Sequence, residues 1–274
     1  MFVRSLIVAA GLALALGAHA QQRLRISNQL PPSSAMSKGL ELWKQKLEAA
    51  TGGAVKVELY HSSQLYKDNE VVAAVQRKNV EMGLVVASQF AAYDPYFAVF
   101  DLPGLFTSYE QAIRAIDGEL GKTLSARLNK LGVQPMYWAQ QGFVEIGTTK
   151  RQLAKPADFK GMKLRVHSKE LSRMAQLLGA APTTIAASEV STALTQGTVD
   201  GITTSISSYD ARKWFEGAPN ITTSHFGLVA VIVVMNQDLW KGLPQNVKSA
   251  IQSASQTAGA YSTQTVVNEE SELI

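Results

Sequence analysis

Arg165 is the residue of this chain whose type and setting most suggest recognition chemistry. It lies in the segment KGMKLRVHS (160–168), where a Lys-Gly turn leads into a short strand over 162–166. Because side chains alternate between the two faces of a strand, Arg165 points away from the face that Leu164 and Val166 share. A solvated charge or a structural salt bridge would explain such a residue. The alternative is that Arg165 faces a cleft and binds a carboxylate in the forked geometry of its guanidinium.

The sequence offers little for covalent catalysis or metal binding. It contains no HExxH or GxSxG motif, no cysteine and no glycine-rich phosphate-binding loop. His167 follows Arg165 on the same strand face and could line a site, although a partly exposed histidine at a strand end is the simpler interpretation. Glu189 and Asp200 fit helix capping or solvated charge. These features favour binding over catalysis, with no cofactor and no metal.

The N-terminal segment has the pattern of a secretory signal peptide over 1–20. Arg4 supplies the positive charge, residues 5–17 are almost wholly apolar, and Ala-His-Ala at 18–20 resembles a cleavage site. We therefore expect cleavage after residue 20 and export. Because the chain has no cysteine, the exported protein must be stabilised by its hydrophobic core alone. This suits a protein of the bacterial periplasm better than a small secreted protein that depends on disulfides. The 26 basic and 22 acidic residues are interspersed, which argues against nucleic acid as a partner.

The pattern of apolar residues after the N-terminal segment predicts an α/β fold. In the segment 33–53, Leu40, Trp43 and Leu47 follow helical spacing, and Gly-Gly ends the helix. The apolar run 226–235 is too short for a membrane span and predicts a buried strand. Alternating strands and helices imply a parallel sheet covered by helices. The expected order is strand 23–31, helix 33–53, strand 54–65, helix 68–80, strand 81–89 and, further along, one helix over 108–132.

Several motifs resemble those of periplasmic substrate-binding proteins of tripartite ATP-independent periplasmic (TRAP) transporters, the C4-dicarboxylate-binding type and its relatives. The specific ones are KGMKLRVHS and the segment LGAAPTTIAASEVSTALTQGTVDG at 178–201. SSQL at 62–65, DLPGLF at 101–106 and LWKGLP at 239–244 add to them. The resemblance covers the chain from about residue 23 to its end.

This resemblance implies a two-lobed, type II-like periplasmic binding protein with a ligand cleft between the lobes and strand crossovers as the hinge. Lobe I would comprise 23–142 plus 231–268, and lobe II 143–230. Because relatives usually continue beyond the point where this chain stops, we expect the C-terminal return to lobe II to be largely missing. The implied function is capture of a small organic acid in the periplasm and its delivery to the membrane subunits of a TRAP transporter.

The resemblance also assigns site residues. It implies that Arg165 forms a salt bridge to the ligand carboxylate. The sialic-acid-binding relatives carry a second arginine where this chain has Glu145, and an asparagine where it has Thr204. With Val86 and Ala187 at two further cleft positions, these differences favour a smaller and less hydroxylated ligand than a sialic acid. A hydroxy-, keto- or aromatic monocarboxylate, or a compact acid carrying a cation, would fit.

Other candidates for ligand contact come from polar strand ends and from aromatic side chains near the lobe crossover. Carboxyl ends of strands are where clefts form in open α/β sheets. The aromatic side chains could equally be core or hinge packing. Two further functions stay open: an exported hydrolase or isomerase that uses Glu145 and His167 as acid and base, and a sensor protein that presents a ligand. The further candidates are Gln64, Ser88, Gln89, Trp138 and Phe143.

Overall fold

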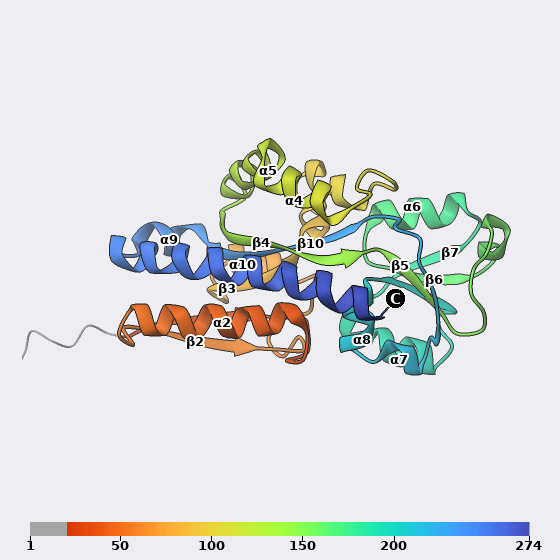
Figure 1. Cartoon of the computed structure of the whole chain (residues 1–274), viewed down its shortest axis with the longest axis horizontal. Coiled ribbons are helices and arrows are strands. Elements are labelled where there is room, and N and C mark those ends of the chain that lie inside the picture. The colour runs from red at the N-terminus through yellow and green to blue at the C-terminus, as the bar shows by residue number, and fades with distance from the viewer. Residues whose placement is uncertain (1–20, 274) are drawn as a thin grey trace, which may run out of the picture.

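The computed structural model describes residues 21–273. The predicted signal peptide lies outside the described residues. Within 21–273 no helix combines the length and the apolar character that a bilayer span requires. The chain folds into two lobes, each built on a five-stranded sheet (Figure 1). This arrangement confirms the predicted two-lobed α/β fold.

The sheet of lobe I has the strand order β2-β1-β3-β10-β4. Strands β1 and β2 pair in parallel, as do β1 and β3, which agrees with the expected order of the first 90 residues. The parallel arrangement does not extend to the whole sheet, because β10 pairs antiparallel with both β3 and β4. The strands are β1 (Gln22–Ser27), β2 (Val55–Tyr60), β3 (Met82–Val86), β4 (Val133–Phe143) and β10 (Leu228–Asn236).

Helices cover both faces of this sheet (Figure 1). One face packs on α2 and the long α10, where Trp43 is fully buried and donates from Nε1 to Ser255 Oγ at 3.0 Å. The single helix expected over 108–132 is two helices, because the chain bends at Gly118. The helical elements of this lobe are α2 (Ala35–Ala50), α3 (Val71–Gln76), η1 (Ala87–Ala92), η2 (Pro95–Asp101), α4 (Tyr109–Asp117), α5 (Glu119–Lys130), α9 (Gln237–Gly242) and α10 (Gln245–Leu273).

Lobe II has the strand order β7-β6-β8-β5-β9. Strand β6 is parallel to both β7 and β8, whereas β5 is antiparallel to β8 and β9. Its strands are β5 (Glu145–Thr148), β6 (Lys163–Val166), β7 (Ala181–Thr184), β8 (Gly201–Thr204) and β9 (Asn220–Thr222), and its helical elements are η3 (Pro156–Phe159), α6 (Lys169–Leu177), η4 (Ala187–Glu189), α7 (Val190–Thr195), α8 (Ile206–Ala211) and η5 (Trp214–Glu216).

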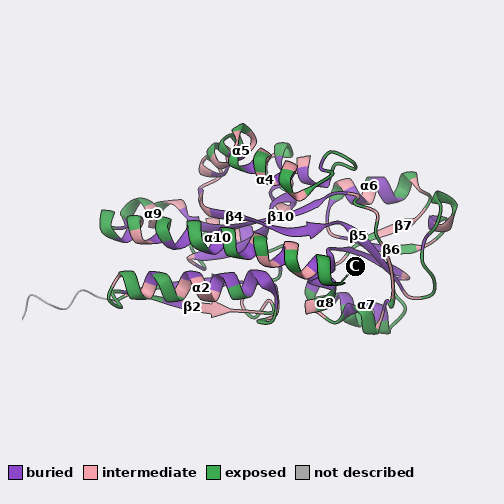
Figure 2. Ribbon diagram, in the orientation of Figure 1, coloured by how far each residue is buried: buried purple, intermediate pink, exposed green. Residues whose placement is uncertain are grey.

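The chain passes between the lobes on two extended segments. One joins β4 to β5 through Val144, and the other joins β9 to β10. The two segments are hydrogen-bonded to each other, since Val144 N–H donates to Gly227 O at 2.8 Å and Phe226 N–H donates to Val144 O at 3.1 Å. Strand β10 of lobe I begins at Leu228, slightly before the boundary expected at 231. Figure 2 shows that β10, and the end of β4 next to its crossover, are buried.

Candidate functional site

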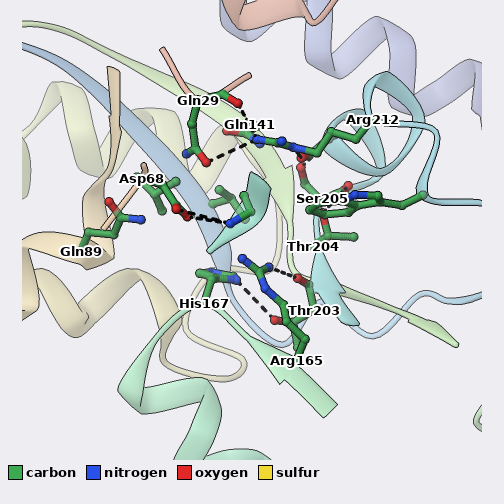
Figure 3. A pocket seen from close by; sticks show the side chains of 15 residues that line it. Gln29, Asp68, Gln89, Gln141, Arg165, His167, Thr203, Thr204, Ser205 and Arg212 are labelled. Atoms are coloured by element: carbon green, nitrogen blue, oxygen red, sulfur yellow. Dashed lines mark hydrogen bonds between the residues drawn. The ribbon is translucent and has the colours of Figure 1, made fainter. Parts of the chain in front are cut away.

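A cavity lies between the two lobes, at the ends of strands from both sheets (Figure 3). It is small, about 30 Å³, because the lobes meet across it, and it adjoins a larger groove of about 600 Å³. Asp68, Gln89 and His167 line both. Lobe I contributes Gln29, Asp68, Val86, Gln89, Gln141 and Val229 to the cavity, and lobe II contributes Arg165, His167, Ala187, Thr203, Thr204, Ser205, Ser208, Arg212 and Trp214.

Arg165 projects into this cavity from β6 (Figure 3). Its side chain is almost fully buried, and it donates from Nε to Ile185 O and from Nη1 to Thr203 O, both at 3.0 Å. No hydrogen bond uses Nη2, and no carboxylate within 21–273 forms a salt bridge with this guanidinium. Burial lowers the pKa of Arg165 to about 10, with Asp68 opposing the shift. The group is therefore still a cation at neutral pH and has a donor free for an anion.

Arg212 is a second cation in the same cavity, half-buried, and it is not among the residues predicted from the sequence. It follows α8 and donates from Nε to Ser208 Oγ at 3.2 Å and from Nη2 to Gln29 O, in lobe I, at 3.0 Å. Its guanidinium lies 5.1 Å from the centre of the Trp214 ring, and that of Arg165 lies 5.8 Å from the same ring. Burial and the charge of Arg165 lower the pKa of Arg212 to about 10.

Asp68 is the one acidic residue among those that line this inner cavity. It is buried, and both carboxylate oxygens lie 3.3 Å from the N–H of Ala187, so it connects lobe I to lobe II. Two arginines and one aspartate give the cavity a formal charge of +1. A buried net positive charge is costly unless an anion compensates it. The electrostatics therefore favour an anionic ligand.

Of the residues proposed from sequence, Arg165, Thr204, Gln89 and His167 line the cavity, and Ser88 lines the adjoining groove. His167 Nδ1 lies 3.3 Å from Thr203 Oγ1, and its Nε2 lies 3.7 Å from the buried Asp101 of lobe I. These residues come from strand ends in both sheets, which is why the fold brings them together.

The other proposed contacts lie away from the cavity and the groove. Gln64 is exposed in the segment that follows β2. Trp138 packs against Phe100 inside lobe I and donates from Nε1 to Ser125 Oγ at 3.4 Å. Phe143 is buried against Tyr109. The aromatic side chains therefore serve core and hinge packing, which was the alternative interpretation of these residues.

Glu145 also lies outside the cavity, at the crossover between the lobes. Its carboxylate accepts hydrogen bonds from the N–H of Ser224 and, at 3.1 Å, from the N–H of His225. His225 Nε2 lies 3.4 Å from the other oxygen. Burial raises the pKa of Glu145 in spite of these hydrogen bonds. Since Glu145 does not line the cavity that His167 lines, the two residues are not arranged as an acid and base around one substrate.

The chain belongs to the bacterial extracellular solute-binding proteins of family 7, whose family model matches residues 26–274. It is 35% identical to the C4-dicarboxylate-binding periplasmic protein DctP of Rhodobacter capsulatus over 258 residues, which are 91% of this chain and 76% of that protein. It is 25% identical to the 2,3-diketo-L-gulonate-binding periplasmic protein YiaO of Escherichia coli, with 98% of this chain and 83% of that protein covered.

Solved structures give the same result. A TRAP periplasmic solute-binding protein of Sulfurospirillum deleyianum with bound succinate has a TM-score of 0.88 and 27% identity, with 92% of this chain and 82% of that chain covered. DctP7 of Bordetella pertussis, an extracytoplasmic solute receptor binding pyroglutamic acid, has a TM-score of 0.88 and 26% identity, with 92% and 83% covered. The chain is thus a TRAP-type solute-binding protein, as the sequence predicted, and not an enzyme.

Proposed function

We propose that this protein captures a compact organic acid by binding its carboxylate at Arg165. The observation that carries the proposal is the buried guanidinium, which lies between the lobes with Nη2 free of hydrogen bonds to residues 21–273. A carboxylate oxygen at Nη2 would complete the donor set with a charge-assisted hydrogen bond. Ile185 O and Thr203 O already fix the plane of the guanidinium, so the ligand would meet a preorganised donor.

Arg212 narrows the class of ligand. Because it adds a second cation to the cavity, the ligand end that faces it should carry an acceptor, either a second carboxylate or a keto or hydroxy oxygen. An ammonium group there would meet like charge. The relatives in Rhodobacter capsulatus and Sulfurospirillum deleyianum, named for C4-dicarboxylates and solved with succinate, support a short dicarboxylate as the first candidate.

The proposed setting is the periplasm, reached through cleavage of residues 1–20, and the proposed partner is the membrane complex of a TRAP transporter. In the proposed binding cycle, the two lobes close around the bound acid. Contacts that already cross the cleft, Arg212 to Gln29 and Asp68 to Ala187, would stabilise the closed form. A ligand shifts the lobes toward closure only as far as it binds the closed form more tightly.

Isothermal titration calorimetry would test this function. The protein would be titrated with succinate, butyrate and pyroglutamate, and each compound would then be recovered and analysed. We expect at least one acid to bind, to raise the melting temperature and to be recovered unchanged, with succinate bound more tightly than butyrate. Chemical conversion of a bound acid, or absence of binding to every acid of this size, would contradict the proposal.

A further inference from the structure

A cluster that contains two buried carboxyl groups lies at the crossover between the lobes, apart from the ligand cavity. Its members come from segments far apart in the sequence: α4, the junction of β4 and β5, the segment before β10, and α10. The cluster consists of Tyr109, Phe143, Glu145, His225 and Glu270. Recognition of the ligand at Arg165 uses none of these residues.

Glu145 connects the two crossover segments. Its own backbone belongs to one segment, and its carboxylate accepts hydrogen bonds from the backbone N–H groups of Ser224 and His225 in the other. The rings continue the contact, since Phe143 and His225 lie 4.5 Å apart between centroids and Phe143 and Tyr109 lie 5.0 Å apart. Bending of the hinge must therefore move the surroundings of this carboxylate.

Glu270 brings a second buried carboxyl group to the same place. Its Oε2 accepts a hydrogen bond from the Tyr109 hydroxyl, whereas Oε1 is buried with no partner among residues 21–273. A Cβ added at Gly142 would lie 2.1 Å from Glu270 Oε1 and 2.9 Å from Ser205 Cβ. The carboxyl group is thus held between the end of β4, in lobe I, and the residue that caps α8, in lobe II.

The groups that act on Glu270 can be named element by element. Tyr109 of α4 and Glu145 of β5 face it, and Glu269 precedes it on α10. Glu269 is itself 3.4 Å from Lys38 Nζ of α2 and accepts from Ser207 Oγ of α8 at 3.3 Å. His225 faces Glu145.

Electrostatics favour a proton in this cluster. Burial and the nearby carboxylates raise the pKa of Glu270 to about 7, although the hydrogen bond from Tyr109 opposes the rise, and burial also raises the pKa of Glu145. A buried carboxyl oxygen without a donor is unfavourable when ionised and acceptable when protonated. A hinge movement that admits water would relieve the ionised form.

We propose that Glu270, buried at the crossover beside Glu145, makes the hinge sensitive to protons: protonation of Glu270 stabilises the arrangement in which the lobes meet, and loss of that proton favours opening. With a pKa of 4.5 for the solvated group and about 7 for the buried one, linkage gives about a tenfold change in the ratio of closed to open protein between pH 6 and pH 8. The inference rests on the proposed function only in assuming that the lobes open and close.

Distance measurement without ligand tests this directly, so that a failure of ligand binding would not affect the result. The chain contains no cysteine, and spin labels can therefore be attached at Thr123→Cys on α5 and Gln176→Cys on α6, both exposed. Electron paramagnetic resonance would give the distribution of distances between the lobes from pH 5.5 to pH 8.5. We expect the closed fraction to fall as pH rises toward 7 and to level off above that pH, because the ratio of closed to open protein changes only between the pKa of the solvated group and that of the buried one.

Four variants, each made in the spin-labelled protein, show which residue causes the pH dependence. Glu270→Gln should remove the pH dependence, whereas the matched control Glu269→Gln should keep it. Tyr109→Phe removes a donor to the ionised carboxylate and should extend the fall of the closed fraction to higher pH, a result that would hold even if Glu270→Gln failed to fold. His225→Gln should keep the dependence. A pH-independent distribution in the unmodified hinge, or pH dependence that survives Glu270→Gln, would overturn the proposal.

Discussion

Removal of the Arg165 side chain should separate ligand affinity from protein stability. In Arg165→Ala the ligand loses its charge-assisted hydrogen bond at Nη2. Such a bond contributes about 1.5–3 kcal/mol, which corresponds to a loss of roughly 10- to 150-fold in affinity. The free protein, in contrast, loses a buried cation that Arg212 repels. The guanidinium groups of Arg165 and Arg212 both lie close to the Trp214 ring, and the charge of Arg165 lowers the pKa of Arg212.

The free energy of unfolding should therefore fall by less than about 1 kcal/mol or even rise, since deletion of an uncompensated buried charge offsets the loss of packing. Calorimetry with succinate would give the affinity, and urea denaturation without ligand would give the stability. Arg173→Ala, at an exposed position of α6, serves as the control for loss of positive charge and should leave both quantities unchanged.

Arg165→Lys tests geometry apart from charge. A lysine keeps the positive charge but cannot donate to Ile185 O and Thr203 O and still present a donor in the same plane. We expect affinity between that of the original protein and that of Arg165→Ala. Unchanged affinity in both variants would show that Arg165 does not bind the ligand and would refute the reasoning.

The other predictions concern the second arginine, the hinge and the core. Arg212→Gln should weaken succinate by at least about tenfold and butyrate much less, measured by calorimetry, because only the diacid has a carboxylate for this cation; equal losses would contradict the role. Because the pKa of Glu270 is raised from 4.5 to about 7, its ionisation lowers stability as pH rises through that window, by up to about 3 kcal/mol above pH 7. Glu270→Gln should therefore raise the melting temperature at pH 8 and leave it nearly unchanged at pH 4.5, and a rise at both pH values would argue against this linkage. Trp43→Ala should cost about 3–5 kcal/mol in urea denaturation, since it leaves a cavity between α2 and α10 and an unpaired Ser255; a loss below about 1 kcal/mol would contradict that packing.

Local patterns predicted much of lobe I. The apolar run 226–235 is the buried strand β10, and the helix expected over 33–53 is α2 with Trp43 in its core face. These predictions succeed because hydrophobic periodicity reports directly on which face is buried. Strand direction, in contrast, depends on the path of the chain through the whole of lobe II, and so the antiparallel position of β10 could not be predicted from its own residues.

The site was predictable only in part, for a similar reason. Arg165 stood out because a permanent charge within a short apolar strand is unusual. Arg212 and Asp68 carry no such local signal: one follows a polar helix and the other precedes a helix, where charges are common. Only the fold shows that both line the cavity beside Arg165, with Asp68 buried and Arg212 half-buried. The position of Glu145 likewise depends on the second crossover, whose backbone N–H groups bind its carboxylate.

The most direct measurement is a crystal structure of the protein with the acid that co-purifies with it or, failing that, with succinate. We expect a carboxylate oxygen about 3 Å from Arg165 Nη2, in the cavity between the lobes, with Arg212 facing the opposite end of the ligand. A ligand bound elsewhere, with Arg165 Nη2 still free of contact, would contradict it.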